Sequence, residues 1–384
     1  MKVSHQRMLC ARCCSVSLVR SASRSGRSHL GGLLDWSPMP DDDEQTRGDG
    51  AGGFDDNGEL DRLDDEDDRE GTTATPDEVI ALILDESQAI PFHDLPALSS
   101  ADNETAGNLL SMWPRISAAR RREVLATLQR QAEDDSALDY DRVHLTALQD
   151  PDTATRILAV RGLWEQERED VMRLLVTTLR SDVEASVRAE AATILGQYVV
   201  SMEFGMLPED ASEFLCEALR DSVEDGGEED EVRARSLEAL GAASDEWVAE
   251  MIAEHYESGT ARLRLASIRA MGRNASDDWL PILIYNFDDD DSETRAAAAI
   301  AAGQLLLDTA VEPLALLAEG DDDDEVQLAA VHALGEIAGE AAEAVLTRLL
   351  NAEPWLADAA RHALAEARLI ALDDAEDDDE DERE

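Results

Sequence analysis

Lysine, cysteine, aromatic residues and long apolar runs are all scarce in this sequence of 384 residues. Lys2 is the one lysine, so arginine supplies nearly all of the positive charge. Four cysteines, three of them near the start, do not support a disulfide framework. No apolar stretch reaches about 18 residues, so the sequence predicts no transmembrane helix. Aromatic residues make up 4%, which disfavours a large sheet, because strands are enriched in aromatic and β-branched side chains.

Acidic residues are by contrast abundant. Acidic residues number 87 against 33 basic ones, which gives a formal net charge of −54. Such a surface repels phosphate groups, so the sequence predicts no nucleic-acid partner, and without an apolar span it predicts no membrane partner. Adaptation to a salty cytoplasm and the codon bias of a GC-rich genome are two further interpretations of the excess, and the arginine preference fits either. We expect a cytoplasmic protein.

The two ends of the chain differ in composition from its middle. Residues 1–38 are basic and serine-rich without an acid before Asp35, which indicates an over-extended gene start with Met39 as initiator or, alternatively, a targeting peptide. The single Cys10-x-x-Cys13 lacks a second pair, so we do not expect a zinc site there. Residues 39–75 and 372–384 are rich in acid and poor in large apolar side chains, so both segments are predicted to be disordered.

Helical signals fill the chain between these segments. Thr75 followed by Pro76 is a typical helix start, with a capping hydroxyl and a proline in the first turn. Residues 76–149 are predicted to form a helical N-terminal cap with degenerate repeats, and 150–371 a regular repeat array.

The repeat is defined by an arginine that opens most units, at successive spacings of 32, 45, 31, 31, 32 and 30 residues. A small residue follows three positions later, a large apolar residue seven later and, in five consecutive units, glycine eight later. The opening positions are Arg156, Arg188, Arg233, Arg264, Arg295, Gln327 and Ala357, and the glycines are Gly196, Gly241, Gly272, Gly303 and Gly335. Offsets of three and seven share one helix face, so each unit predicts a helix that packs through its small residues and ends near its glycine.

A second amphipathic stretch follows each glycine, for example at 171–179, 211–219, 248–256 and 341–350. Each unit is therefore predicted to be helix–turn–helix, and none could bury its apolar face alone. The 45-residue interval leaves room for about one extra turn and a loop, within 200–207 and 225–230.

The segments VRARSLEALG at 232–241 and VQLAAVHALG at 326–335 resemble the short HEAT repeats that also occur in phycobilisome-lyase-like proteins. The resemblance implies an all-α fold, a right-handed solenoid of stacked helix–turn–helix repeats of the HEAT and armadillo type. It implies a protein–protein interaction scaffold that binds its partner on the concave face. It also implies an alternative function, a lyase or enzyme-maturation accessory protein of the phycobilisome-lyase-like type.

Sequence patterns of catalysis are missing. Deoxyhypusine hydroxylase, a di-iron HEAT enzyme, resembles this fold but needs repeated His-Glu pairs, and this chain has no His-Glu dipeptide. Neither G-x-S-x-G nor G-x-x-x-x-G-K occurs. His332 and His362 take equivalent repeat positions, and we interpret them as surface histidines, not metal ligands. We expect a protein without catalytic residues, cofactor or metal.

Two acidic turns, Asp288–Asp291 and Asp321–Asp324, hold more carboxylates than helix capping needs. Solvation, cation binding and a basic partner are the possible reasons, and solvation is the favoured one because no calcium-loop pattern is present.

A candidate partner surface follows from the second helices. Offsets 11 and 15 from each glycine are mostly apolar and are predicted to face the core, whereas offsets 9, 13 and 16 share the opposite face. By resemblance to HEAT solenoids this opposite face is predicted to line the concave side. It carries Glu250, Glu254, Glu257, Tyr285, Asp288, Glu312, Leu316 and Glu319. An aromatic flanked by carboxylates predicts a basic peptide with one apolar anchor as the partner. An ordinary solvated face, with Tyr285 and Leu316 packed against their neighbours, is the alternative interpretation.

Overall fold

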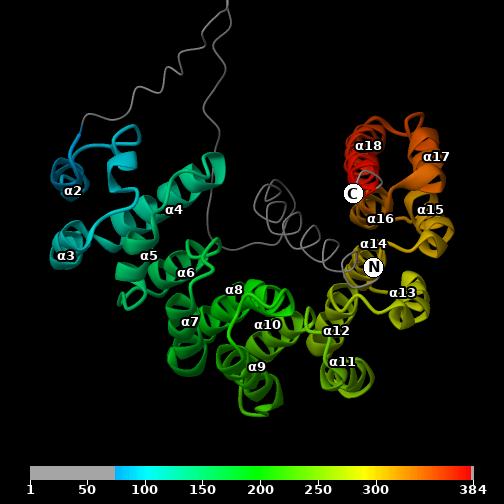
Figure 1. Ribbon diagram of the computed structural model, residues 1–384, viewed down its shortest axis with the longest axis horizontal. Helices are drawn as coiled ribbons and strands as arrows, with labels where there is room; N and C mark the ends of the chain where they lie inside the picture. Colours follow the sequence, from blue (N-terminus) through cyan, green and yellow to red (C-terminus); the bar gives the residue numbers. More distant parts are fainter. Residues whose placement is uncertain (1–73, 382–384) are drawn as a thin grey trace, which may run out of the picture.

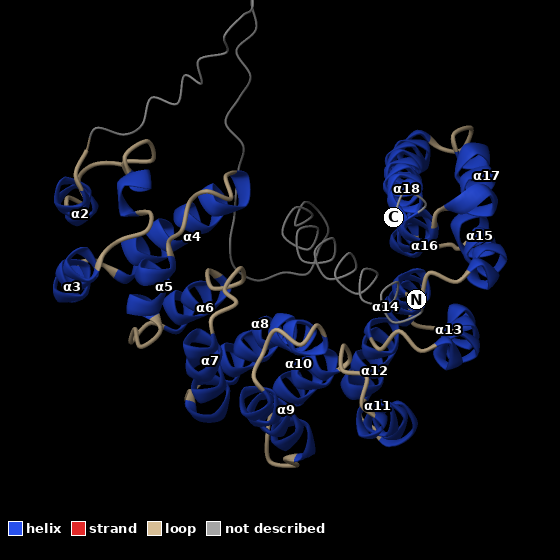
Figure 2. Ribbon diagram, in the orientation of Figure 1, coloured by secondary structure: helices blue, strands red, loops and turns tan. Residues whose placement is uncertain are grey.

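The computed structural model of the protein describes residues 74–381, with side chains as far as residue 369. Every regular element within that range is a helix, as Figure 2 shows, so the predicted all-α class is confirmed. The predictions for residues 1–38, including the cysteines there, and for nearly all of 39–75 lie outside the described residues.

The N-terminal helices form a cap with a core of its own. The cap comprises α2 (Pro76–Leu84), η1 (Leu95–Leu98), α3 (Asn103–Met112), η2 (Trp113–Arg115), α4 (Ala118–Asp134) and α5 (Asp141–Ala147). Thr75 begins α2 as predicted, because its side chain accepts from the Glu78 backbone while the Glu78 side chain accepts from the Thr75 backbone. The buried side chains of the cap form a cluster separate from that of the repeats.

The repeat helices stack in two rows that bend into an open arc (Figure 1). The inner row consists of α6 (Thr153–Arg161), α8 (Ala185–Glu203), α10 (Asp230–Leu240), α12 (Ala261–Arg273), α14 (Ser292–Gln304), α16 (Asp324–Ile337) and α18 (Pro354–Asp381). The outer row consists of α7 (Glu169–Ser181), α9 (Glu209–Glu224), α11 (Glu246–Ser258), α13 (Leu280–Tyr285), α15 (Val311–Gly320) and α17 (Gly339–Leu349). Short turns η3 (Asp277–Trp279), η4 (Asn286–Asp288) and η5 (Asp308–Ala310) flank α13 and α15. Each unit is thus helix–turn–helix, as predicted.

The arginine-bearing helices, not the second helices, line the concave side (Figure 1). The prediction that the second helices face inward is therefore wrong, and the small residues explain why. A Cβ placed on Gly272 would lie 2.6 Å from Ala301 Cα, and one on Gly303 would lie 2.6 Å from Ala333 Cα. Inner helices can therefore approach one another closely, and they contact each other more extensively than the outer helices do. The row that packs more closely becomes the inside of the curve.

The same glycines lie close to the ends of the inner helices. As predicted, most inner helices end near their glycine: α10 ends directly before Gly241, and α12, α14 and α16 end one or two residues after Gly272, Gly303 and Gly335. Only α8 differs, because it continues past Gly196 to Glu203. At Gly241, Gly272 and Gly303 a Cβ would lie 2.9, 2.6 and 2.6 Å from an alanine Cα of the next inner helix, so a side chain there has no room. At Gly196 the nearest such atom would be 3.4 Å away, which is an ordinary contact.

The helix ends show two further differences. In the long 45-residue interval α8 continues to Glu203 and α9 ends at Glu224, so most of the extra length is helix. At the other end α18 continues to Asp381, into the segment 372–384 that the composition predicts to be disordered. Extending an existing helix adds one hydrogen bond for each residue that it fixes, which offsets the poor helix propensity of aspartate. Residues 382–384 lie outside the described residues.

The opening arginines connect consecutive repeats. Arg156 donates to both carboxylate oxygens of Asp182 at 2.8 and 2.9 Å, and Arg295 does the same with Asp321 at 2.8 Å to each oxygen. Each guanidinium also donates to a backbone carbonyl six residues earlier, that of Asp150 or Asp289. We call these contacts the arginine straps.

The acidic turns Asp288–Asp291 and Asp321–Asp324 bind arginine and cap helices, so solvation is not the only reason for their carboxylates. Asp321 binds the Arg295 strap and also accepts from the Asp323 backbone at 2.9 Å. Asp291 caps α14, because its side chain accepts from the backbone of Thr294. Asp289 and Asp323 accept from the backbone of Asp291 and Glu325, so four residues in these turns are fixed by protein contacts. Asp322 also pairs with Arg295 but is almost fully exposed.

Candidate functional site

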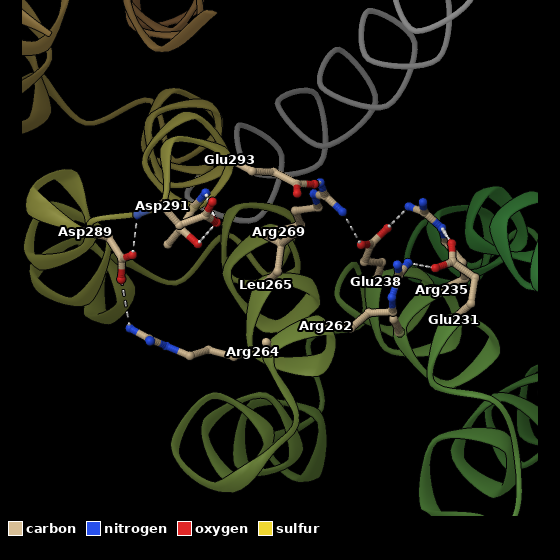
Figure 3. Close-up of a pocket in the computed structure, with 13 residues that line it drawn as sticks. Glu231, Arg235, Glu238, Arg262, Arg264, Leu265, Arg269, Asp289, Asp291 and Glu293 are labelled. Atoms are coloured by element: carbon tan, nitrogen blue, oxygen red, sulfur yellow. Dashed lines mark hydrogen bonds and ion pairs between the residues drawn. The ribbon is translucent and has the colours of Figure 1, made fainter. Parts of the chain in front are cut away.

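A pocket of about 550 Å³ lies on three consecutive inner helices, α10, α12 and α14, and on the turn before α14 (Figure 3). Its lining is Glu231, Ala234, Arg235, Glu238, Ala261, Arg262, Arg264, Leu265, Arg269, Asp289, Asp291, Glu293 and Thr294. The stacking of inner helices brings these residues together, since they come from the first halves of three successive repeats.

Glu238 is the centre of the pocket's charge network. Its side chain is only 7% exposed and accepts from Arg235 at 2.8 Å and from Arg269 at 3.1 Å. A carboxylate this buried needs such partners, because removing it from water without compensation is costly. Two cations on one buried anion fix the position of α12 relative to α10.

The network extends to both sides of Glu238, as Figure 3 shows. On α10, Arg235 also donates to Glu231 at 3.0 Å, and Glu231 pairs with Arg262 of α12. Toward α14, Arg269 donates to Glu293 at 3.0 Å. We call this chain of contacts from Glu293 to Glu231 the charge ladder.

The lining is nearly neutral although the chain is strongly acidic. It contains four arginines and five carboxylates, for a formal charge of −1, whereas the whole chain carries −54. Because the guanidinium groups of the ladder are already paired, the pocket does not offer a free cation for a phosphate. It offers instead a neutral, arginine-rich surface, of the kind that is frequent in protein interfaces.

The inner row also carries exposed apolar side chains outside the pocket. Ile300 takes the repeat position that Glu238 and Arg269 take in the two preceding repeats, and it is 38% exposed. Trp355 takes the position of Glu231 and Glu293 and is 37% exposed. Together with half-buried Leu265 in the pocket, they give the inner row exposed apolar area from α12 to α18.

The residues predicted as the partner surface lie in the outer row. Glu250, Glu254 and Glu257 belong to α11, Tyr285 ends α13, Asp288 follows it, and Glu312, Leu316 and Glu319 belong to α15. Their prediction as a concave surface is wrong, because the outer helices carry them. Their prediction as an exposed face is right, and the alternative of a packed Tyr285 and Leu316 is not supported, since these side chains are 75% and 70% exposed.

Sequence reasoning missed the charge ladder. Its central contacts join residues one repeat apart, such as Glu238 and Arg269, which take the same offset from their opening arginines. Comparison of equivalent offsets between neighbouring repeats would have shown glutamate followed by arginine there.

Within residues 74–369, histidines and other metal-ligating residues do not form a centre. His332 lies 3.7 Å from Glu336 and His362 is exposed. The described part of the chain contains no group of three or more His, Cys, Asp or Glu residues placed to hold a metal ion. Over the same residues, no helix combines the length and apolar character that crossing a bilayer requires.

Comparison with known proteins gives a family match and several similar folds. HEAT repeats match residues 143–226 and 280–367. The complex of the phycocyanin lyase subunits CpcE and CpcF from Nostoc sp. PCC7120 is 19% identical, with a TM-score of 0.46 over 74% of this chain and 97% of that one. Human deoxyhypusine hydroxylase is 18% identical, with a TM-score of 0.31 over 69% and 95%. Importin beta is 16% identical, with a TM-score of 0.38 over 76% and 46%.

No curated protein sequence matches the chain. The matched ranges contain the stacked helix pairs from α5 to α9 and from α13 to α18, with their arginine straps and small-residue contacts. The chain is therefore a HEAT-repeat protein.

Proposed function

We propose that this protein is a non-catalytic scaffold that binds a partner protein on the concave face of its inner row. The observation that carries the proposal is the nearly neutral pocket on α10, α12 and α14, together with the exposed apolar side chains Ile300 and Trp355 on the same inner row. The centres of protein interfaces are depleted in net charge and enriched in arginine and aromatic side chains, so this surface suits a protein partner.

The ionic contacts within the pocket support a binding function over catalysis. Glu238, Arg235 and Arg269 are held by one another, so their positions are fixed before a partner arrives. A preorganised surface loses little side-chain entropy on association. A general acid or base, by contrast, has to exchange protons with a substrate, and these groups are committed to ion pairs. The predicted cytoplasmic location is part of the same proposal.

The proposal is tested by capture of partners from the native host, followed by rebinding to variants. Ile300→Asp places a charge on the inner row and is expected to reduce binding of the captured partner at least about tenfold, because such a charge has to be desolvated in the interface. Leu174→Asp is the matched control, since Leu174 is 45% exposed in α7 of the outer row. Circular dichroism verifies that both variants are folded. Equal binding by Ile300→Asp and the unchanged protein would refute the proposal.

A further inference from the structure

A second surface lies on the outer row and has a different chemistry. Tyr285 of α13 and Leu316 of α15 are 75% and 70% exposed. Each lies 13 positions after its repeat glycine, so they take equivalent places on two consecutive outer helices. Two large apolar side chains at neighbouring equivalent positions make an exposed apolar pair.

Three aromatic rings on the outer helices α9 and α11 lie against arginine. Arg173 and Arg180 lie over the ring of Phe214, at 5.0 and 5.2 Å from its centroid. Arg220 lies 3.6 Å from the centroid of the Trp247 ring, and Arg264 lies 5.2 Å from that of Tyr256. Among the described residues, Tyr285 has no such arginine over its ring. Trp279 and Phe287, in the turns beside α13, also lack an arginine but are buried, so Tyr285 presents an exposed ring without a cation over it.

The charges around the apolar pair would attract a cation. The helices α11, α13 and α15 contain no arginine or lysine. Their outward face carries six exposed carboxylates, from Glu250, Glu254, Glu257, Asp288, Glu312 and Glu319. Arg348 of α17 pairs with Glu319 at 3.1 Å, which leaves the other five without a salt bridge among the described residues. We call Tyr285, Leu316 and these six carboxylates the outer strip.

We propose that the outer strip binds a basic segment of a partner protein, with a guanidinium or ammonium group over the Tyr285 ring and an apolar side chain on Leu316. Charge complementarity identifies this occupant. A second copy of the chain, an anionic membrane and a nucleic acid all carry charge of the same sign as the strip and are repelled by it. The outer strip is separate from the concave pocket, so its function does not depend on the scaffold function proposed above.

The test uses a synthetic twelve-residue peptide of arginine and glycine with one central leucine, labelled with a fluorophore and titrated with the full chain by fluorescence anisotropy. Tyr285→Ala and Leu316→Ala are each expected to weaken binding at least about fivefold, because one removes the cation–π contact and the other the apolar contact. Leu174→Ala is the matched control on α7 and is expected to bind as the unchanged protein does.

A double-mutant cycle separates the apolar contact from general attraction to an acidic protein. Replacing the peptide's leucine with glycine is expected to weaken binding to the unchanged protein but not further to Leu316→Ala. Binding that falls with salt but is the same for all three variants would reflect net charge alone and would overturn the proposal. A synthetic peptide of residues 1–34, which is basic and free of acid, serves as a second probe. If that peptide alone showed Tyr285-dependent binding, the strip would be a site for the chain itself and the assignment to a partner would be wrong.

Discussion

Individual arginines connect the repeats, and their chemistry explains why lysine does not replace them. The guanidinium of Arg295 makes two parallel contacts to Asp321 and a third to the Asp289 carbonyl, all at 2.8 Å. Both side chains are largely buried, at 12% and 6% exposed. The Arg295 hydrogen bond holds the pKa of the Asp321 carboxyl below its usual value. A lysine ammonium cannot make this planar, forked set of contacts.

Arg295→Ala is therefore expected to lower the free energy of unfolding by about 2–3 kcal/mol, because it leaves Asp321 buried without its cation. Arg295→Lys is expected to restore less than half of the loss, since the charge returns without the second hydrogen bond. Urea unfolding followed by circular dichroism measures both. Arg361→Ala is the control, because Arg361 is 63% exposed, and it should change stability by less than about 0.5 kcal/mol. Similar losses of unfolding free energy in Arg295→Ala and Arg361→Ala would mean that the Arg295–Asp321 contact does not stabilise the fold.

Two buried titratable residues in α5 carry opposite pKa shifts. Burial lowers the pKa of His144 to about 4, and the Nδ1 atom of this side chain has no hydrogen-bond partner. Burial, assisted by the neighbouring carboxyl of Asp139, raises the pKa of Asp141 to about 7. Between pH 4 and 6.5 the native state therefore holds a protonated Asp141 and a neutral His144, while the unfolded chain holds the reverse. Both states bind the same number of protons at these two residues, so their contributions to pH dependence cancel.

Asp141→Asn removes the contribution of Asp141 to the pH dependence of stability and leaves that of His144. Because the pKa of Asp141 is raised in the native state, its stabilising contribution is complete at acidic pH and is lost as pH rises toward 7. Relative to the unchanged protein, Asp141→Asn is expected to gain stability as pH rises from 4.5 to 7, by about 1 kcal/mol per pH unit. Thermal unfolding at several pH values measures the difference. The exposed Asp134→Asn is the control, and a pH-independent difference for Asp141→Asn would contradict a protonated native carboxyl.

At the scale of elements, the small residues of the inner helices determine the curvature. Ala298 and Ala330 are fully buried, and a Cβ on Gly303 would lie 2.6 Å from both Ala333 Cα and Ala333 Cβ. Backbone approach this close fixes the separation of α14 and α16, while Leu283, Phe287 and Leu314 pack from the outer helices. A larger side chain has to push the inner helices apart.

Gly303→Ala is accordingly expected to destabilise the protein by about 1–3 kcal/mol, although alanine is the better helix former. Gly320→Ala is the matched control, because no atom lies within 4 Å of a Cβ at the end of α15. It should be neutral or slightly stabilising. Chemical denaturation of the two variants side by side measures the contrast, and equal effects would mean that the inner helices do not meet at Gly303.

The sequence predicted the elements better than their arrangement. Arginine, small residue and glycine at fixed offsets identified the helix pairs, and offsets 9, 13 and 16 identified an exposed face that includes Tyr285 and Leu316. Which row becomes concave depends on which one packs more closely, and that depends on contacts between repeats, such as Gly272 against Ala301. The charge ladder was missed for the same reason, because Glu238 and Arg269 meet only when two repeats stack.

At the scale of the whole molecule, net charge opposes the compact state. The chain carries −54, so like charges along the arc repel one another over distances at which no specific pair forms. The exposed ion pairs contribute little stability each, and salt screens them as well as the repulsion. The repulsion is the larger of the two effects because acid exceeds base by more than twofold.

Raising NaCl from about 0.05 to 0.5 M is therefore expected to increase the thermal midpoint by several degrees, because the Debye length falls below the separation of most carboxylates. Differential scanning calorimetry measures the shift. Potassium chloride and sodium chloride should act alike, since screening depends on ionic strength. A midpoint that falls with salt would mean that surface ion pairs, and not repulsion, dominate the electrostatics.

The two rows give the molecule two faces of different character. The inner row carries a nearly neutral pocket and the exposed side chains of Ile300 and Trp355, and the outer row carries the carboxylates of α11 and α15. The central claim is that the main partner lies along the inner row.

Hydrogen–deuterium exchange of the chain, with and without the partner captured from its host, tests that claim most directly. Residues at an interface are shielded and locally stabilised, so their amides exchange more slowly in the complex. We predict that slowing is concentrated in α10, α12 and α14, with little change in α7 and α9. Slowing confined to the outer helices, with α10, α12 and α14 unchanged, would contradict the account.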